Sequence, residues 1–375
     1  YHRNLKRIWS YSILKTYNAA IIGCGRMGAF IDNEVVGEPG VVFPYSHAGG
    51  YSSSDRTKLI ACSDFRGDLM EAVGDKYDIP LERQYTDYLE MVDKEELDIV
   101  SVTTHVEHHS KIVIDLANAG VKAIFCEKGL APSLYEANQM AEACERNGTI
   151  LNLGAQRRYH PGFSKMKEII DSGELGSVQS MVITYSAGLF DHGCHVVDLA
   201  LYLAGDPHAV WVQGHAPTSD ELKDGDIYKD DPGGDGVVQL DNGITIYFLH
   251  TNRYEYQVNC ENGTLGTMRD TLGWFMRKGQ PRGLEEVQYP GFEPASSTVN
   301  LIEDLAKSLD SGSPPLGGIE SARHGVEIMV AILESHLQNG RRIEMPLKDS
   351  SLRMTRSDRD SWQKGLRWRE PKLSV

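Results

Sequence analysis

A carboxylate and a histidine stand four residues apart at the start of one helical pattern, "DHGCHVVDLALYLAGD", as Asp191 and His195. Residues at this spacing share one face of a helix. The imidazole of His195, with a reference pKa of about 6.5, can take a proton from a hydroxyl group, and such base catalysis contributes about 100- to 10,000-fold in rate. Asp191 can orient the substrate or the imidazole, and Asp198, one turn further on, can fix the ring tautomer. The alternative is a structural role, in which these polar residues hydrogen-bond at the helix N-terminus and Asp191 is its cap.

A glycine-rich turn earlier in the chain has the spacing of a dinucleotide-binding loop. In "AAIIGCGRMGAFID", Gly23, Gly25 and Gly28 follow an apolar run and precede a helical pattern, with Arg26 and Met27 between the last two. In such a loop the first glycine permits the turn, the second admits a pyrophosphate to the backbone, and the third packs helix against strand. A purely structural glycine turn is the alternative.

An acidic residue ends the next apolar run, "KLIACSD", at Asp64. A carboxylate there can accept hydrogen bonds from an adenosine ribose and would repel a 2′-phosphate, which favours NAD over NADP. Arg66 leaves use of both cofactors open, and a cap for the following helix is the alternative role of Asp64.

The elements that must position these residues fall into two groups. In the first half, the apolar runs "NAAIIGCG", "KLIACSDF", "LDIVSVTT", "VKAIFCEK" and "TILNLGAQ" alternate with helical patterns, and an insertion rich in Gly, Pro and Ser lies between Asp32 and Ser54. This rhythm predicts βαβ units and a parallel sheet, with the insertion as a loop at its carboxyl edge. After residue 156, strand-like runs with a hairpin turn at Asp241–Gly243 and three amphipathic helices predict an α+β layer. The fold class is therefore α/β, with a parallel-sheet domain over 1–155, a second domain with an antiparallel sheet over 156–348, and an arm or tail over 349–375.

Over nearly its full length the chain resembles the Gfo/Idh/MocA oxidoreductases. The resemblance is carried by "GCGRMG", by "TTHVEHH" after the fourth strand, by "CEKGLA" after the fifth, and by "DHGCHVVDLALYL". It implies that the first domain is a Rossmann dinucleotide-binding domain and that the second is an α/β domain with a large, mostly antiparallel open sheet, which often forms homodimers or homotetramers. It also places Glu127 and Lys128 at the nicotinamide end of the cofactor and Asp191 and His195 opposite them. The family usually has Glu-Lys-Pro, whereas this chain has Gly129 after the lysine.

Within this resemblance Lys128 would stabilise developing alkoxide character while His195 takes the hydroxyl proton. We therefore expect Lys128, His195 and Asp191 to be catalytic. The residues expected to bind NAD are Gly23, Gly25, Arg26, Met27, Gly28, Asp64, Thr103, His105, His108, Glu127, Lys128 and Gln156. Those expected to bind substrate are Lys128, Arg157, Arg158, Tyr159, Asp191, His192 and His195.

Three further groups invite chemical interpretations. His105, His108 and His109 resemble a metal cluster, but neighbouring histidines point apart and no carboxylate or cysteine completes a coordination sphere, so we expect no metal. In "GAQRRYHPGF" an arginine pair and aromatic rings suit polyol or anion recognition, although ordinary interdomain ion pairing is expected for at least one arginine. In "PYSHAGGY" His47 and Tyr51 are candidate lid residues.

The composition of the chain argues against some classes of binding partner. The net charge of −15 opposes nucleic acid and anionic membrane surfaces. The six cysteines have no Cys-x-x-Cys spacing, and no apolar stretch is long enough to span a bilayer, so we expect a cytoplasmic protein with reduced thiols.

The favoured function is an NAD-dependent dehydrogenase that acts on a secondary hydroxyl of a sugar, glycoside or inositol. A second hypothesis is an NAD-dependent glycoside hydrolase that works by transient oxidation, elimination, water addition and re-reduction. A nucleotide-binding sensor without turnover is the third, because a fold alone does not establish activity.

Overall fold

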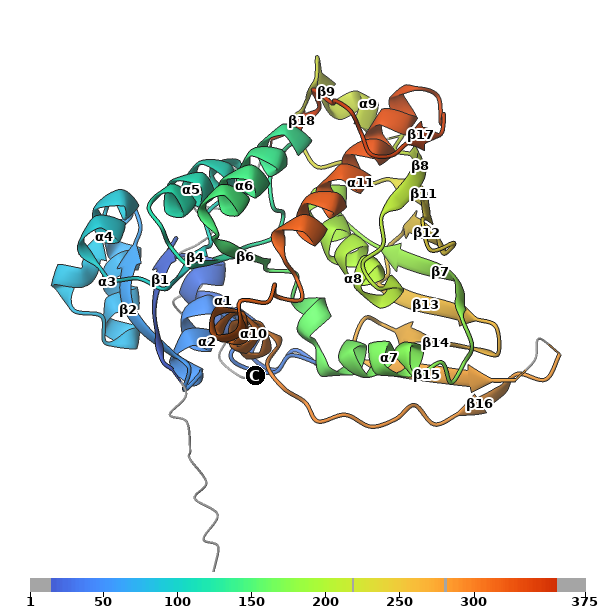
Figure 1. Cartoon of the computed structure of the whole chain (residues 1–375), viewed down its shortest axis with the longest axis horizontal. Helices are drawn as coiled ribbons and strands as arrows, with labels where there is room; N and C mark the ends of the chain where they lie inside the picture. Colours follow the sequence, from blue (N-terminus) through green and yellow to red (C-terminus); the bar gives the residue numbers. More distant parts are fainter. Residues whose placement is uncertain (1–14, 218, 280–281, 356–375) are drawn as a thin grey trace, which may run out of the picture.

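A computed structural model describes residues 15–217, 219–279 and 282–355, and Figure 1 shows two large sheets with helices on and between them. The first sheet confirms the predicted Rossmann arrangement, with six parallel strands in the order β3-β2-β1-β4-β5-β6. The strand order reverses between β1 and β4, and open parallel sheets bind ligands outside the carboxyl ends of the strands at such a point. The strands are β1 (Tyr17–Ile22), β2 (Thr57–Ser63), β3 (Gln84–Tyr85), β4 (Ile99–Val102), β5 (Ala123–Cys126) and β6 (Ile150–Leu153).

Helices cover both faces of this sheet because its central strands are apolar on both sides. Along β1, Ala20 and Ile22 join the core formed with α4, α5 and α6, whereas Ala19 and Ile21 join the core formed with α2, α3 and α10. This is the alternation that a strand imposes on successive side chains. The helices of this half are η1 (Arg26–Phe30), α1 (Ile31–Glu34), α2 (His47–Ser53), α3 (Gly67–Tyr77), η2 (Leu81–Arg83), α4 (Tyr88–Lys94), α5 (Val106–Asn118) and α6 (Leu134–Asn147).

Two elements differ from the expected domain plan. The insertion between Asp32 and Ser54 is only partly a loop, because its second part forms the buried helix α2. The helix α10 (Ser297–Ser311), expected in the second domain, packs its apolar residues into the core of the first sheet, beside α2. Its apolar face covers the side of the sheet that η1 and α1 leave open, because these two short helices contain only nine residues in total.

The second sheet confirms the large, mostly antiparallel arrangement. Its nine strands run in the order β16-β15-β14-β13-β7-β12-β11-β8-β17, and only the β7–β12 pair is parallel among the described strands of this sheet. The predicted hairpin joins β11 to β12. The strands are β7 (Val178–Tyr185), β8 (Ala209–His215), β11 (Asp235–Leu240), β12 (Thr245–His250), β13 (Glu255–Cys260), β14 (Gly263–Met268), β15 (Gly273–Lys278), β16 (Glu285–Val287) and β17 (Ile343–Glu344).

One face of the second sheet is covered by helices that also contact the first domain. Buried residues of α7, α8 and α11 share one continuous core with α5 and α6, so α11 joins the two halves (Figure 1). The remaining elements are η3 (Gln156–Tyr159), α7 (Pro161–Asp171), η4 (Leu189–Gly193), α8 (Cys194–Ala204), α9 (Ser219–Leu222), α11 (Ile319–Leu337), β9 (Lys223–Asp224), β10 (Ile227–Tyr228) and β18 (Arg353–Met354).

The C-terminal arm predicted over 349–375 is described only as far as residue 355, and the rest lies outside the described residues. Within it, β18 pairs with β10, and Leu352 and Met354 are buried. None of the helices in the described part of the chain has the length and apolar character needed to cross a membrane.

Candidate active site

The three glycines after β1 differ in what surrounds them. Gly23 has a φ of +100°, and a Cβ on it would lie 2.9 Å from the carbonyl carbon and oxygen of Thr103. A Cβ on Gly28 would lie 2.1 Å from the carbonyl oxygen of Gly23, so η1 packs directly against the loop. Around Gly25, by contrast, no heavy atom of the described residues comes within 4 Å of a Cβ position. A tight turn, close helix packing and an open approach are what a pyrophosphate requires, so the loop fits NAD.

Asp64 lies at the carboxyl end of β2, beside this loop. Its carboxylate accepts hydrogen bonds from the backbone N–H of Cys24, at 2.7 Å, and of Arg66, at 2.8 Å. Burial raises the pKa of Asp64, and these two bonds only partly oppose the rise. Asp64 thus braces the glycine loop and the turn before α3, while Arg66 forms an ion pair with Asp68. Arg26 pairs in the same way with Glu34, at 2.7 Å, and Met27 is half-buried beside it.

The histidines after β4 have three separate environments. His105 is the N-cap residue of α5, His108 is exposed on α5, and His109 is buried. The two ring nitrogens of His109 lie 3.0 Å from the carbonyl oxygens of Gly129 and Thr104, so this ring bridges the loops that follow β4 and β5. Among the described residues, no three His, Cys, Asp or Glu side chains gather in a way that would hold a metal ion. Thr103 instead contacts the glycine loop, where its hydroxyl donates to the carbonyl of Gly23 at 2.6 Å.

A buried polar cluster supports the turn after β5. Glu127 contacts His47 through Oε1, 3.0 Å from Nε2, and accepts from the backbone N–H of Lys128 at 3.2 Å. The His47 ring stacks on Phe125 and bonds Ser101, which also contacts the hydroxyl of Tyr51. His47 and Tyr51 are both fully buried, so the prediction that they form a lid is wrong. They lie beneath the site because α2 packs onto the first sheet instead of crossing over it.

Lys128 reaches across to the second domain. Its ammonium forms an ion pair with the carboxylate of Asp191 and donates to the backbone oxygen of Asp191 at 3.0 Å. Burial by itself would lower the pKa of Lys128, but the negative charge of Asp191 outweighs it, and the pKa is raised. The ammonium therefore stays charged at neutral pH. The pair joins the carboxyl edge of the first sheet to η4.

His195 stands one turn beyond Asp191, at the start of α8. Burial lowers its pKa well below the ordinary value, and the positive charges of Arg157 and Lys128 lower it further. A neutral imidazole at physiological pH is what a proton acceptor needs. Its Nδ1 is buried and has no hydrogen-bond partner among the described residues. The prediction that Asp198 fixes its tautomer is wrong, because the carboxylate of Asp198 is bonded to Arg158.

A carboxylate that the sequence did not single out holds the turn that carries Asp191. Asp231 accepts from the backbone N–H of Phe190, at 3.0 Å, and of Asp191, at 2.6 Å. A Cβ on Gly188 would lie 2.0 Å from the carboxyl group of Asp231, so a glycine is needed for this approach. Half-buried His192 lies in the same turn, with its ring centroid 5.8 Å from that of Tyr254.

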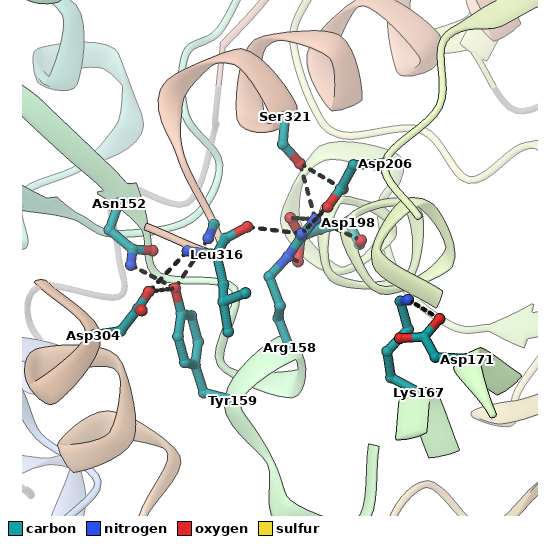
Figure 2. A network of polar contacts seen from close by, with 11 residues as sticks. Asn152, Arg158, Tyr159, Lys167, Asp171, Asp198, Asp206, Asp304, Leu316 and Ser321 are labelled. Carbon is teal, nitrogen blue, oxygen red and sulfur yellow. Dashed lines mark hydrogen bonds and ion pairs between the residues drawn. The ribbon is translucent and has the colours of Figure 1, made fainter. Parts of the chain in front are cut away.

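The arginine pair in η3 divides between two roles. Arg157 is paired with Asp270, at 2.7 Å, and lies over the ring of Tyr254, near His195. Arg158 is fully buried and extends the other way, into the network of Figure 2. Its guanidinium bonds the carboxylates of Asp198 and Asp206 in the second domain, which is the interdomain ion pairing expected for one of the two.

The substrate-binding predictions for Arg158 and Tyr159 are therefore wrong. The hydroxyl of Tyr159 bonds Asn152, Asp304 and the backbone of Gly317, and the ring is buried (Figure 2). Gln156 is buried as well, and its side-chain N–H donates to Thr298 at 2.9 Å. Successive residues of a tight 3-10 turn point in different directions. Only Arg157 of this group lies among the charged residues of the site.

The comparisons with known proteins agree with this architecture. The sequence profile of Gfo/Idh/MocA, an oxidoreductase family with an NAD-binding Rossmann fold, matches residues 17–155. The myo-inositol 2-dehydrogenase of Thermotoga maritima is 26% identical over 317 residues, which cover 79% of this chain and 89% of that protein. The D-apiose dehydrogenase of Paraburkholderia graminis is 28% identical over 210 residues, 52% of this chain and 51% of the relative.

Two solved structures share the fold over most of the chain. The aldose-aldose oxidoreductase of Caulobacter crescentus, complexed with glycerol, superposes with a TM-score of 0.73 at 19% identity, covering 88% of this chain and 100% of that one. An oxidoreductase of Agrobacterium radiobacter, in complex with NAD+, L-tartaric acid and magnesium, gives a TM-score of 0.70 at 19% identity, covering 88% of this chain and 98% of that one. Both likenesses concern the fold alone.

Proposed function

The chain belongs to the Gfo/Idh/MocA family of oxidoreductases, and we propose that it oxidises a secondary hydroxyl of a sugar, a glycoside or an inositol with NAD as hydride acceptor. The observation that carries the proposal is the meeting of Lys128, from the end of β5, with Asp191 and His195 of the second domain, at the edge of the sheet where the glycine loop lies. Relatives named for inositol and apiose oxidation support the choice of a polyol.

Each residue of this group has a role that its surroundings support. NAD, when bound, supplies the acceptor for the hydride that leaves the carbinol carbon. His195 accepts the hydroxyl proton, because its lowered pKa keeps the imidazole neutral. Lys128 directs its ammonium at the same oxygen and stabilises the developing negative charge, and Asp191 holds that ammonium in place.

The cofactor-binding residues follow from the loop geometry. Gly23, Gly25 and Gly28 would hold the pyrophosphate and Asp64 the adenosine ribose, which favours NAD over NADP. Thr103 and Glu127 would line the nicotinamide end through the loops after β4 and β5.

The test is an absorbance assay at the NADH band with purified protein, NAD and a panel of sugars, glycosides, inositols and uronates, followed by product analysis. We expect NADH and a keto product in equal amounts, and loss of both in the Lys128→Ala variant with nearly unchanged NAD binding. Wild-type rates in that variant would remove Lys128 from the mechanism. Cleavage of a glycoside without NADH accumulation, lost when the cofactor is stripped, would replace the proposal with the hydrolase hypothesis.

A further inference from the structure

The loop between α1 and α2, residues 35–46, links the two domains beside the candidate site. On the first-domain side, the carboxylate of Asp32 accepts from the backbone N–H of Tyr45, at 2.6 Å, and of Ser46, at 3.2 Å. On the second-domain side, Gly40 lies so close to the β14–β15 turn that a Cβ on it would be 2.8 Å from the hydroxyl oxygen of Thr271. The loop is therefore fixed at two points, with Tyr45 next to one of them.

Tyr45 has a fixed backbone and an uncommitted side chain. Its carbonyl oxygen accepts from the hydroxyl of Thr298, at 2.9 Å, and from the amide of Gln156, at 3.4 Å. With the bond to Asp32, both polar groups of its backbone are engaged. Its ring is half-buried, and within the described residues its hydroxyl has no hydrogen-bond partner. The loop thus holds this phenol in place without using it.

The groups whose charges act on this phenol are those of the candidate site. They are Glu127 and Lys128 from the end of β5, Arg157 from η3 and Asp270 from the β14–β15 turn. Tyr45 precedes His47, which contacts Glu127, by two residues, and its carbonyl is bonded to Gln156, next to Arg157, so the loop places Tyr45 beside these charged groups. Burial raises the pKa of Tyr45, so the phenol keeps its proton at neutral pH.

We propose that Tyr45 binds the substrate, its phenol forming a hydrogen bond with the hydroxyl next to the carbon that is oxidised. The inference rests on the proposed function, because it needs a polyol in the site. A phenol can donate and accept, as a sugar hydroxyl can, and its ring offers an apolar surface to the C–H groups of the sugar. Tyr45 itself transfers no proton, so it sets affinity and selectivity and leaves the chemical step to His195 and Lys128.

The experiment compares the full-length wild type with Tyr45→Phe, which removes one oxygen atom and keeps the ring. Tyr135→Phe is the matched control, since Tyr135 is exposed on α6. For the best substrate of the panel we expect Tyr45→Phe to raise KM about tenfold, the value of one hydrogen bond, with kcat and NAD affinity little changed. The control should match the wild type.

A second measurement uses the deoxy substrate that lacks the neighbouring hydroxyl. The wild type should show the raised KM with it, and Tyr45→Phe should add nothing further, because the bond is already lost. Equal KM values for wild type and Tyr45→Phe with the full substrate would overturn the role of Tyr45 and leave the dehydrogenase intact. A wild type that oxidises nothing in the panel would overturn the proposed function, and the role of Tyr45 with it.

Discussion

Removing the guanidinium of Arg158 should destabilise the folded protein without a direct effect on substrate binding or catalysis. The group is fully buried and donates to Asp198 at 2.8 and 3.0 Å, to Asp206 at 2.8 Å and to the backbone oxygen of Leu316 at 2.8 Å. In the Arg158→Met variant the carboxylate of Asp198, 3% exposed, would keep its burial and lose its counter-charge. Breaking a buried pair from one side costs about 3–5 kcal/mol of the free energy of unfolding.

For a domain of this size, that loss lowers the melting temperature by roughly 6 °C or more. This loss of stability should be smaller at acidic pH. Burial already raises the pKa of Asp198 against the pull of Arg158. Without Arg158 the pKa rises further, so protonation at low pH removes the unpaired charge and with it part of the penalty.

The assay is thermal unfolding followed by circular dichroism, in neutral and in mildly acidic buffer. Arg146→Met is the matched control, because Arg146 is exposed on α6 and bonds only the side chain of Asn118 in the described structure. The double variant Arg158→Met, Asp198→Asn should melt above Arg158→Met, since it removes the stranded charge. An Arg158→Met variant that melts like the wild type but has a raised KM for the polyol would refute this reasoning and return Arg158 to the substrate site.

Three further predictions concern the site. The acid limb of kcat/KM should lie below pH 6.5, because burial and neighbouring cations lower the pKa of His195, and His195→Ala should abolish turnover while NAD binding remains. An acid limb of the kcat/KM profile that lies above pH 6.5 would exclude His195 as the base. Asp64→Ala should shift the ratio of NAD to NADP affinity toward NADP by about tenfold or more, as measured by titration; an unchanged ratio would make Asp64 purely structural. Asp231→Asn should lower kcat and spare NAD affinity, because it removes the negative charge and puts an amide NH2 where one carboxylate oxygen now accepts from the N–H of Phe190. The exposed neighbour variant Asp230→Asn should match the wild type, and equal kcat values for both would leave Asp231 without a positioning role.

Much of the fold could be predicted because its signals are local. Apolar runs, glycine spacing and the cap at Ser133 each act within a few residues, and β1, the loop after it and α6 lie where the sequence places them. The position of α10 could not be predicted in this way. Its amphipathic pattern shows that one face is buried and does not show which sheet receives it.

Within the site, the sequence indicated which types of residue are present better than it indicated where their side chains point. Arg157 and Arg158 are neighbours of the same type, yet one lies near His195 and the other is buried against α8. In "PYSHAGGY" the same problem arose, because His47 and Tyr51 are buried against the sheet while Tyr45, two residues before His47, is within reach of the charges of the site. Such choices depend on which partner a turn meets in space, and that partner is distant in the chain.

The glycine that replaces the usual proline after Lys128 has a structural explanation. The backbone oxygen of Phe190 lies 3.1 Å from where a Cβ on Gly129 would stand, which is tighter than side-chain carbons normally tolerate. Any larger residue would require η4 to shift by a few tenths of an ångström away from the turn after β5. Since η4 carries Asp191, that shift would also move Asp191 relative to the ammonium of Lys128. Gly129 therefore permits the close contact between η4 and the turn after β5 that brings Lys128 to Asp191, so this departure from the usual Glu-Lys-Pro argues for a working lysine.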